Sequence, residues 1–81
     1  MNLRITVKMP KLAVSMQDGT LSEWLVADGS EVKEGEPLYV VETDKAAQEV
    51  PSPATGTIRL IATTGEDYDV GAPIAEIIFT A

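Results

Sequence analysis

The chain has 81 residues and a net charge of −7, and this length predicts one domain spanning residues 1–81. The acidic balance argues against nucleic acid or an anionic membrane as a partner. The sequence contains no cysteine and no histidine, which excludes disulfides, thiol nucleophiles and Ser-His or Cys-His catalysis. The N-terminus has no apolar secretory segment, and no stretch is long enough to span a bilayer. We therefore expect a soluble intracellular domain.

Short β-strands separated by turn residues are predicted along the whole chain. The odd-numbered residues from Leu3 to Met9 are apolar and alternate with polar residues, which predicts a strand with one buried face. Pro10 cannot donate to a ladder, so residues 10–18 are expected to form a loop. Further strands are predicted at 20–26, 38–43, 47–50, 57–62, 68–70 and 74–79. Because no window shows helical periodicity, the chain is predicted to be all-β, a sandwich or flattened barrel.

Two segments of the chain resemble each other. Residues 19–41, GTLSEWLVADGSEVKEGEPLYVV, align with residues 56–77, GTIRLIATTGEDYDVGAPIAEI. Glycines at matched positions indicate matched turns, since glycine tolerates positive φ. The matched pairs are Gly29 with Gly65 and Gly35 with Gly71. The repeat predicts two similar half-domains packed about a pseudo-twofold axis, with residues 43–55 joining them.

Lys45 lies on this joining segment, at the fold-back point between the strands predicted at 38–43 and 47–50. A lone amine without a cleft is not desolvated, so it cannot act as a Schiff-base catalyst. Asp44 favours a turn and Ala46 is small, so the Lys45 side chain is expected to project from a rigid two-stranded support. Such a lysine is either a solvated turn residue or an amine that another enzyme acylates.

The sequence resembles the lipoyl domain of the 2-oxo acid dehydrogenase acyltransferases, the dihydrolipoamide acyltransferase family of the biotinyl/lipoyl-attachment superfamily. Nearly the whole chain takes part in the resemblance, and DKA stands in register between the two half-repeats, which makes the match specific. The matching segments are MPKLAVSM (9–16), GTLSEWLV (19–26), DGSEVKEGEPL (28–38), ETDKA (42–46) and EVPSPATGTI (49–58).

The resemblance implies a barrel-sandwich hybrid, that is, a flattened barrel of two four-stranded antiparallel sheets with the lysine at a hairpin tip. It implies that Lys45 carries lipoate through an amide bond. The attaching enzyme, a lipoate ligase or octanoyltransferase, would recognise Glu42, Thr43, Asp44 and Ala46. In the family the first loop lies near the lipoyl-lysine, which implies a partner-recognition loop. Its residues here are Leu12, Val14, Ser15, Gln17 and Asp18.

The implied function is transport and not catalysis. In the family, a thiamine-dependent 2-oxo acid decarboxylase reductively acylates the lipoyl arm, the acyltransferase core transfers the acyl group to coenzyme A, and dihydrolipoamide dehydrogenase reoxidises the arm. The cofactor supplies the chemistry, and the tether raises its effective concentration at each active site. We expect a monomer of the bacterial cytoplasm or mitochondrial matrix. Because family members usually continue into a linker and a catalytic core, the chain is either an excised domain or a free-standing carrier.

Three other classes share parts of this pattern. The biotin carrier domains of carboxylases share the fold but place their lysine between two methionines, whereas Asp44 and Ala46 flank Lys45. The carrier of the glycine cleavage system is lipoylated but is longer and has added helices. Unmodified barrel-hybrid domains of efflux adaptors share the topology but have no reason to present DKA at a hairpin tip.

A few residues raise separate questions. Gln48 occupies a position where both the alternation and the family favour an apolar side chain, so it either lies at the sheet margin or its amide finds a partner. Trp24 and Tyr39 are expected to be structural in so small a core. Several acidic residues could suggest a metal site, but they lack ligand-loop spacing and predict a solvated face without a metal. They are Glu31, Glu34, Glu36, Glu42, Asp44 and Glu49.

Overall fold

The computed structural model describes residues 2–12, 14, 16–44 and 46–80. It contains eight β-strands: β1 (Asn2–Lys8), β2 (Asp18–Trp24), β3 (Glu31–Val32), β4 (Pro37–Glu42), β5 (Ala47–Pro51), β6 (Gly56–Leu60), β7 (Glu66–Asp69) and β8 (Pro73–Thr80). Within these ranges there is no helix that could cross a membrane.

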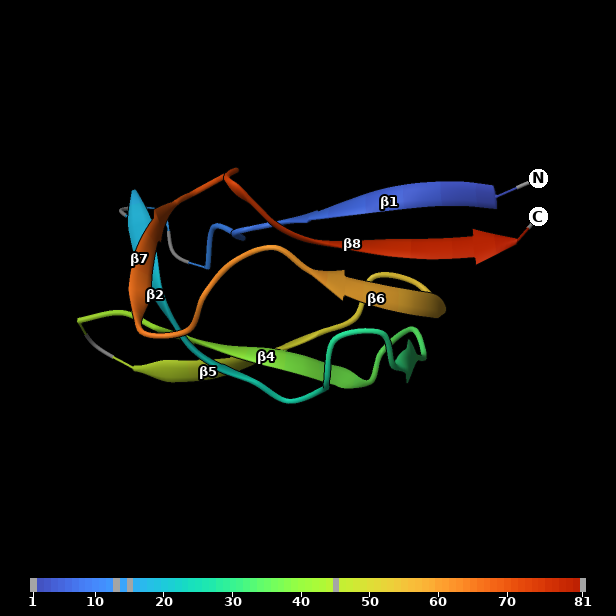
Figure 1. Ribbon diagram of the computed structural model, residues 1–81. Coiled ribbons are helices and arrows are strands. Elements are labelled where there is room, and N and C mark those ends of the chain that lie inside the picture. Colours follow the sequence, from blue (N-terminus) through green and yellow to red (C-terminus); the bar gives the residue numbers. More distant parts are fainter. Residues whose placement is uncertain (1, 13, 15, 45, 81) are drawn as a thin grey trace.

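The strands form two four-stranded antiparallel sheets that face each other (Figure 1). The strand order is β1-β8-β6-β3 in one sheet and β5-β4-β2-β7 in the other. The molecule is elongated, with principal extents of 40 × 20 × 19 Å. The all-β prediction of a flattened sandwich with two four-stranded sheets is confirmed, and the sheets stay separate without closing into one barrel.

The two sheets are built alike, as the internal repeat predicts. When β1 is matched with β5, β8 with β4, β6 with β2 and β3 with β7, the order of one sheet reproduces that of the other. The matched glycines also share their backbone conformation. The φ angles are 83° at Gly29 and 86° at Gly65, and 87° at Gly35 and 91° at Gly71. These are left-handed conformations that favour glycine, so the predicted turn pairs are confirmed.

Reciprocal hydrogen bonds join the two halves. The Gly29 N–H donates to the Ile58 carbonyl at 2.8 Å, and the Gly65 N–H donates to the Leu21 carbonyl at 2.7 Å. Leu21 and Ile58 are both fully buried and occupy equivalent positions in the repeat. Each crossover turn is therefore bonded to the central buried strand of the other half.

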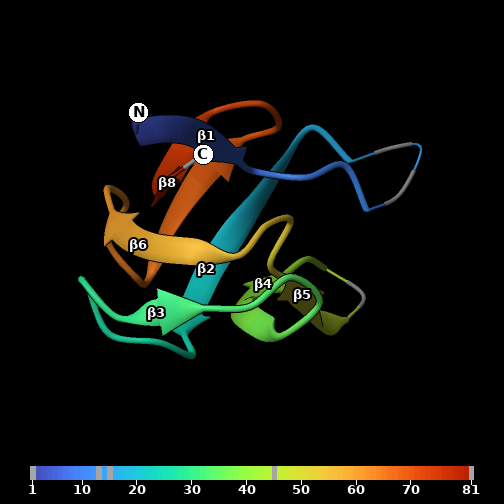
Figure 2. The ribbon, with the colours of Figure 1, turned by 90° about the vertical axis from the view of Figure 1, so that its right-hand side faces the viewer.

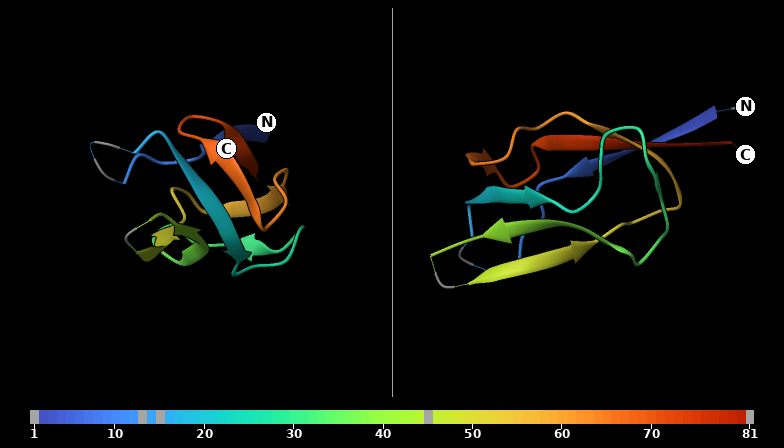
Figure 3. Two further views of the ribbon diagram at one scale, coloured as in Figure 1. Left: turned by 90° about the vertical axis from the view of Figure 1, so that its left-hand side faces the viewer. Right: turned by 60° about the horizontal axis from the view of Figure 1, so that its bottom comes forward.

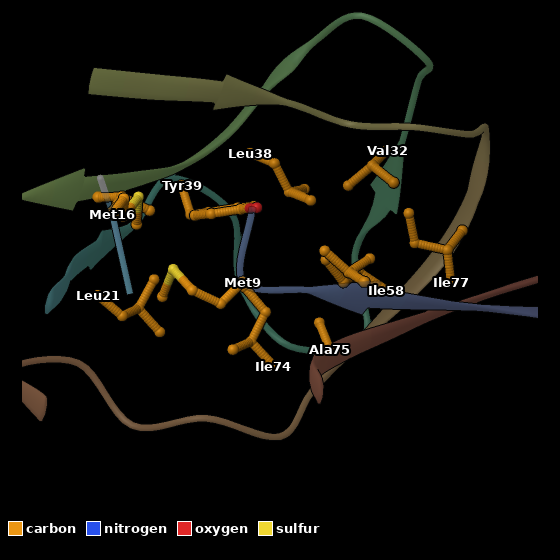
Figure 4. Close-up of a cluster of buried hydrophobic side chains, with 12 residues drawn as sticks. Met9, Met16, Leu21, Val32, Leu38, Tyr39, Ile58, Ile74, Ala75 and Ile77 are labelled. Carbon is orange, nitrogen blue, oxygen red and sulfur yellow. The ribbon is translucent and has the colours of Figure 1, made fainter. Parts of the chain in front are cut away.

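The core lies between the sheets and draws on both halves (Figure 4). The buried hydrophobic side chains are Val7, Met9, Met16, Leu21, Val32, Leu38, Tyr39, Val41, Ile58, Ile74, Ala75 and Ile77. Trp24 is half-buried, its ring centroid lies 5.4 Å from that of Tyr39, and its indole N–H donates to the Ala62 carbonyl at 3.2 Å. The structural role expected of both aromatic residues is therefore confirmed.

Two expectations from the sequence need correction. The continuous buried face predicted from Leu3 to Met9 is right for Val7 and Met9 but wrong for Leu3, which is 39% exposed. The reason is that the β1–β8 ribbon extends beyond the described strands of the facing sheet, which therefore do not cover its end (Figure 1). Strand β3 was not predicted, because two residues are too few to show an alternation. The other strand boundaries differ by one or two residues, as is usual.

Two glycines should respond differently to a methyl group. At Gly65, an added Cβ meets no atom within 4 Å, so Gly65→Ala should cost only the left-handed backbone strain, about 1–2 kcal/mol. At Gly56, the Cβ would lie 2.6 Å from the Ile78 carbonyl oxygen. This contact is with backbone, so Gly56→Ala should cost more, about 3 kcal/mol. Urea unfolding measures both changes, and a larger loss at Gly65 than at Gly56 would contradict this packing.

Stability at high pH should depend on Tyr39. Burial raises the pKa of Tyr39 to about 12, above its unfolded value of about 10. The folded state therefore keeps the proton longer, so this stabilisation is complete below pH 10 and is lost as the pH rises from about 10 towards 12. Its size is about 2–3 kcal/mol. The free energy of unfolding of Tyr39→Phe should decline less over this range, and identical declines for both proteins would count against the burial of the hydroxyl.

Candidate functional site: the β4–β5 hairpin tip

The β4–β5 hairpin is a singular feature of the topology. Among the strands that the structure describes, β4 and β5 are the only pair that is both consecutive in sequence and adjacent in a sheet. Each of the other connections between consecutive strands leads to the opposite sheet. The hairpin tip lies at one end of the elongated molecule. The N-terminal end of β1 and the C-terminal end of β8 lie at the other end (Figure 1).

The two arms of the hairpin are held in different ways. On β4, Leu38, Tyr39 and Val41 are buried in the core, which fixes the inner arm. On β5, residues 47–49 are exposed and Val50 is the first half-buried side chain. The outer arm is thus held mainly by its ladder to β4, which ends at the pair Glu42 and Ala47.

Backbone and side-chain hydrogen bonds close the tip just beyond the ladder. The Thr43 N–H donates to the Ala46 carbonyl at 2.9 Å, and the Thr43 hydroxyl donates to the same carbonyl oxygen at 3.3 Å. The four predicted recognition residues that flank position 45 (Glu42, Thr43, Asp44 and Ala46) are all exposed and lie together here. Lys45 itself, the predicted attachment site, lies outside the described residues.

The predicted partner loop is anchored at its base and exposed at its tip. Val14 is 95% exposed, and Gln17 and Asp18 are exposed, whereas Leu12 packs against the core. Ser15 lies outside the described residues. The anchor is Met16, which is buried and whose Sδ accepts a hydrogen bond from the Leu12 N–H at 3.2 Å. Sequence reasoning missed this role, although the apolar spacing of LAVSM was the available signal.

The register of β2 and β4 brings this loop to the hairpin end. Thr20 pairs with Glu42, the last residue of β4, so the start of β2 at Asp18 runs beside the tip. Seen from that end, the β1–β2 connection and the hairpin tip lie on the same side of the molecule (left panel of Figure 3). The start of β2 therefore lies beside the end of β4, while the proximity of the loop to Lys45 and its role in partner recognition stay predictions.

The structure also answers the question raised by Gln48. Gln48 pairs with Val41, whose side chain is buried, so the alternation directs both to the inner face of the sheet. Gln48 is nevertheless exposed, because β5 is the outermost strand of its sheet. Of the two explanations, the sheet-margin position is therefore the correct one.

The sheet that carries the hairpin is strongly acidic. Its strands contain no lysine or arginine, and their acidic residues are Asp18, Glu23, Glu42, Glu49, Glu66, Asp67 and Asp69. In the described part of the chain, no three of the acidic residues cluster in a way that could hold a metal ion. The surface around the tip is suited to attract positively charged partners and to repel anionic ones.

Residues of β3, β6 and β8 line a groove at the opposite end, and these three strands lie at the end of the molecule that faces the viewer in Figure 2. Its lining includes Val32, Gly56, Ile78 and Phe79. None of the predicted recognition and loop residues that the structure describes lines it. The groove is thus separate from the described residues of the hairpin tip, which form a short exposed turn. An exposed turn of this kind can carry a covalently attached group.

A small β-sandwich with an exposed hairpin tip is the architecture of a carrier domain, and a family comparison agrees with it. The sequence profile described as "Biotin-requiring enzyme", the biotin/lipoyl family, matches residues 5–77. Because the match covers most of the chain, the protein belongs to this family.

Curated relatives place the chain on the lipoyl side of the family. It is 47% identical over 72 residues to the dihydrolipoyllysine-residue acetyltransferase component of pyruvate dehydrogenase complex of Corynebacterium glutamicum, covering 88% of this chain and 11% of that protein. It is 46% identical over 70 residues to the lipoamide acyltransferase component of branched-chain alpha-keto acid dehydrogenase complex of Bacillus subtilis, covering 85% and 16%. These names favour lipoate over biotin.

The relatives also show that domains similar to this chain occur in proteins of different types. The chain is 41% identical over 76 residues to the pyruvate dehydrogenase E1 component subunit beta of Rhizobium meliloti, covering 91% of this chain and 16% of that protein. The chain thus spans between a tenth and a fifth of the length of these relatives. The likeness is confined to the carrier domain and does not extend to the catalytic parts.

Proposed function

We propose that this domain carries lipoate in amide linkage on Lys45 and serves a 2-oxo acid dehydrogenase complex as a mobile carrier of acyl groups and reducing equivalents. The observation that carries the proposal is the position of ETDKA. Its described residues form the exposed end of the only hairpin between consecutive strands in the described part of the chain. The relatives named for lipoyllysine and lipoamide support the choice of cofactor.

The residues at the tip fit a covalently attached arm. Glu42, Thr43, Asp44 and Ala46 are exposed, so an arm attached between Asp44 and Ala46 would extend into solvent without needing a pocket. When bound, lipoate supplies a dithiolane that accepts an acyl group together with reducing equivalents. The protein fixes the position from which the lipoyl group extends, because strand β4 of the hairpin is anchored in the core by Tyr39 and Val41.

The tip residues also suit recognition by the attaching enzyme, a lipoate ligase or octanoyltransferase. Asp44 and Glu42 place negative charge beside the lysine, and Ala46 leaves space for close approach. Three enzymes would use the loaded arm in turn: a thiamine-dependent decarboxylase, an acyltransferase core and dihydrolipoamide dehydrogenase. We place the protein in the cytoplasm of a bacterium, in line with its bacterial relatives, and expect the isolated domain to be a monomer.

The first test is the site of modification. Incubation with a lipoate ligase, lipoate and ATP should add one lipoyl group to the wild type and none to Lys45→Arg, as measured by intact mass. Lys33→Arg is the matched control, because Lys33 is an exposed lysine on another turn, and it should be modified like the wild type. A lipoyl mass on Lys45→Arg would refute the assignment, and modification by a biotin ligase alone would point to the biotin carriers.

The second test concerns the loop 12–18. Val14→Ser should lower the rate of reductive acylation of the lipoylated domain by about three- to tenfold, if the exposed Val14 side chain is buried against the decarboxylase. Its lipoylation and its stability should be unchanged, the latter within about 0.5 kcal/mol, because the side chain has few contacts to lose. Ile61→Ser is the control, since Ile61 is also an exposed apolar residue, at 53%, but lies outside the loop. Equal acylation rates for all three proteins would remove the loop from partner selection.

A further inference from the structure

The hairpin tip is a short turn that is closed by a hydrogen bond. The ladder ends at Glu42 and Ala47, and the Thr43 N–H bonds to the Ala46 carbonyl at 2.9 Å. This closing pair leaves two residues between the arms, of which Asp44 is the first. The favoured two-residue hairpin loops, types I′ and II′, require positive φ at this first position. None of the described non-glycine residues, Asp44 included, has positive φ, so the tip does not use either favoured turn.

Turns of the other types do not match the twist of the two strands, and the strands tend to splay where they enter the loop. Thr43 supplies a second bond at this place, from its hydroxyl to the Ala46 carbonyl at 3.3 Å. One carbonyl oxygen therefore accepts both the backbone N–H and the side-chain hydroxyl of the residue opposite. The extra bond acts at the position where the arms would begin to separate.

Packing does not hold the outer arm near the tip. Residues 46–49 are all exposed, and the first half-buried side chain on that arm is Val50. The inner arm is fixed by the buried Val41 only two residues before Thr43. The outer arm is thus held to the fixed one by the turn itself and by hydrogen bonds, and the Thr43 hydroxyl makes the outermost side-chain bond described there.

We propose that Thr43 is a positioning residue for acylation of the lysine between Asp44 and Ala46, acting through its hydroxyl bond to the Ala46 carbonyl. This inference rests on the proposed lipoylation of that lysine. The hydroxyl bond fixes the position of Ala46, where the outer arm begins. It thereby orients the lysine amine toward the attaching enzyme. Small displacements of a reacting group lower the rate of its reaction strongly, whereas loss of one exposed hydrogen bond changes stability little.

The reaction affected is transfer of the lipoyl group from lipoyl adenylate, the activated substrate of the ligase. The amide N–C bond forms as the C–O bond to the phosphate breaks. AMP leaves with the electron pair of that bond, and the lysine ammonium group releases two protons to solvent. No group of Thr43 takes part in these bond changes, so Thr43 acts on the reaction through the placement of the amine and not through its chemistry.

Two substitutions separate the hydroxyl from the rest of the side chain. Thr43→Val keeps the shape and the backbone bond but removes the hydroxyl, and Thr43→Ser keeps the hydroxyl. Thr57→Val is the matched control, because Thr57 is an exposed threonine on β6, in the other sheet. For transfer from preformed lipoyl adenylate, we expect kcat/KM to fall about three- to fivefold for Thr43→Val. Thr43→Ser and Thr57→Val should stay close to the wild type, and all four proteins should share one melting temperature.

A second readout uses the unmodified domain. The protection factor of the amide at position 43, which corrects for the different intrinsic exchange rates of valine and serine, should be about three- to fivefold lower in Thr43→Val than in Thr43→Ser, since the hydroxyl helps to hold the acceptor in place. Equal kcat/KM for Thr43→Val and the wild type would overturn the positioning role while leaving lipoylation intact. An equal loss for Thr43→Ser would overturn the role of the hydroxyl. Absence of lipoylation in the wild type would overturn the proposed function and this inference together.

Discussion

The two reciprocal hydrogen bonds between the halves are the constraint on which the rest of the structure depends. The Gly29 N–H bonds to the carbonyl of buried Ile58, and the Gly65 N–H bonds to that of buried Leu21. Each bond requires a turn with positive φ in one half and an intact central strand in the other. Opening one half would expose the bonding partner of the other, so we expect the two halves to unfold together.

This interlock determines which end of the molecule carries the hairpin tip. Under the pseudo-twofold relation, the β4–β5 hairpin corresponds to the pair β8–β1. The hairpin tip and the ends of β1 and β8 are therefore equivalent, opposite ends of one frame, as Figure 1 shows. At the hairpin end, the start of β2 runs beside the last residue of β4. The frame thus places the start of β2 beside the end of β4, where the described part of the tip begins.

The sequence was informative where a local rule applies. Matched glycines predicted the paired turns because positive φ is a property of single residues, and ETDKA marked the tip because its register between the halves was visible. Exposure of Leu3 was not predictable, because it depends on how far β1 extends past the facing sheet. Two further features depend on contacts between separate segments: the anchoring of the loop by Met16 and the bonds of Thr43 to Ala46. The periodicity of apolar residues in the sequence does not predict such contacts. For Gln48, the alternation predicted the inner face correctly, but only the edge position of β5 explains its exposure.

Native-state hydrogen exchange at the amides of Gly29 and Gly65 tests the interlock most directly. These two amides belong to different halves, and each bonds to the strand of the other. If the halves open only together, both amides should exchange through global unfolding, with opening free energies equal to each other and to the value from urea unfolding. Opening free energies that differ by more than about 1 kcal/mol would show that one half opens alone, and would contradict the account of a single interlocked frame behind the hairpin tip.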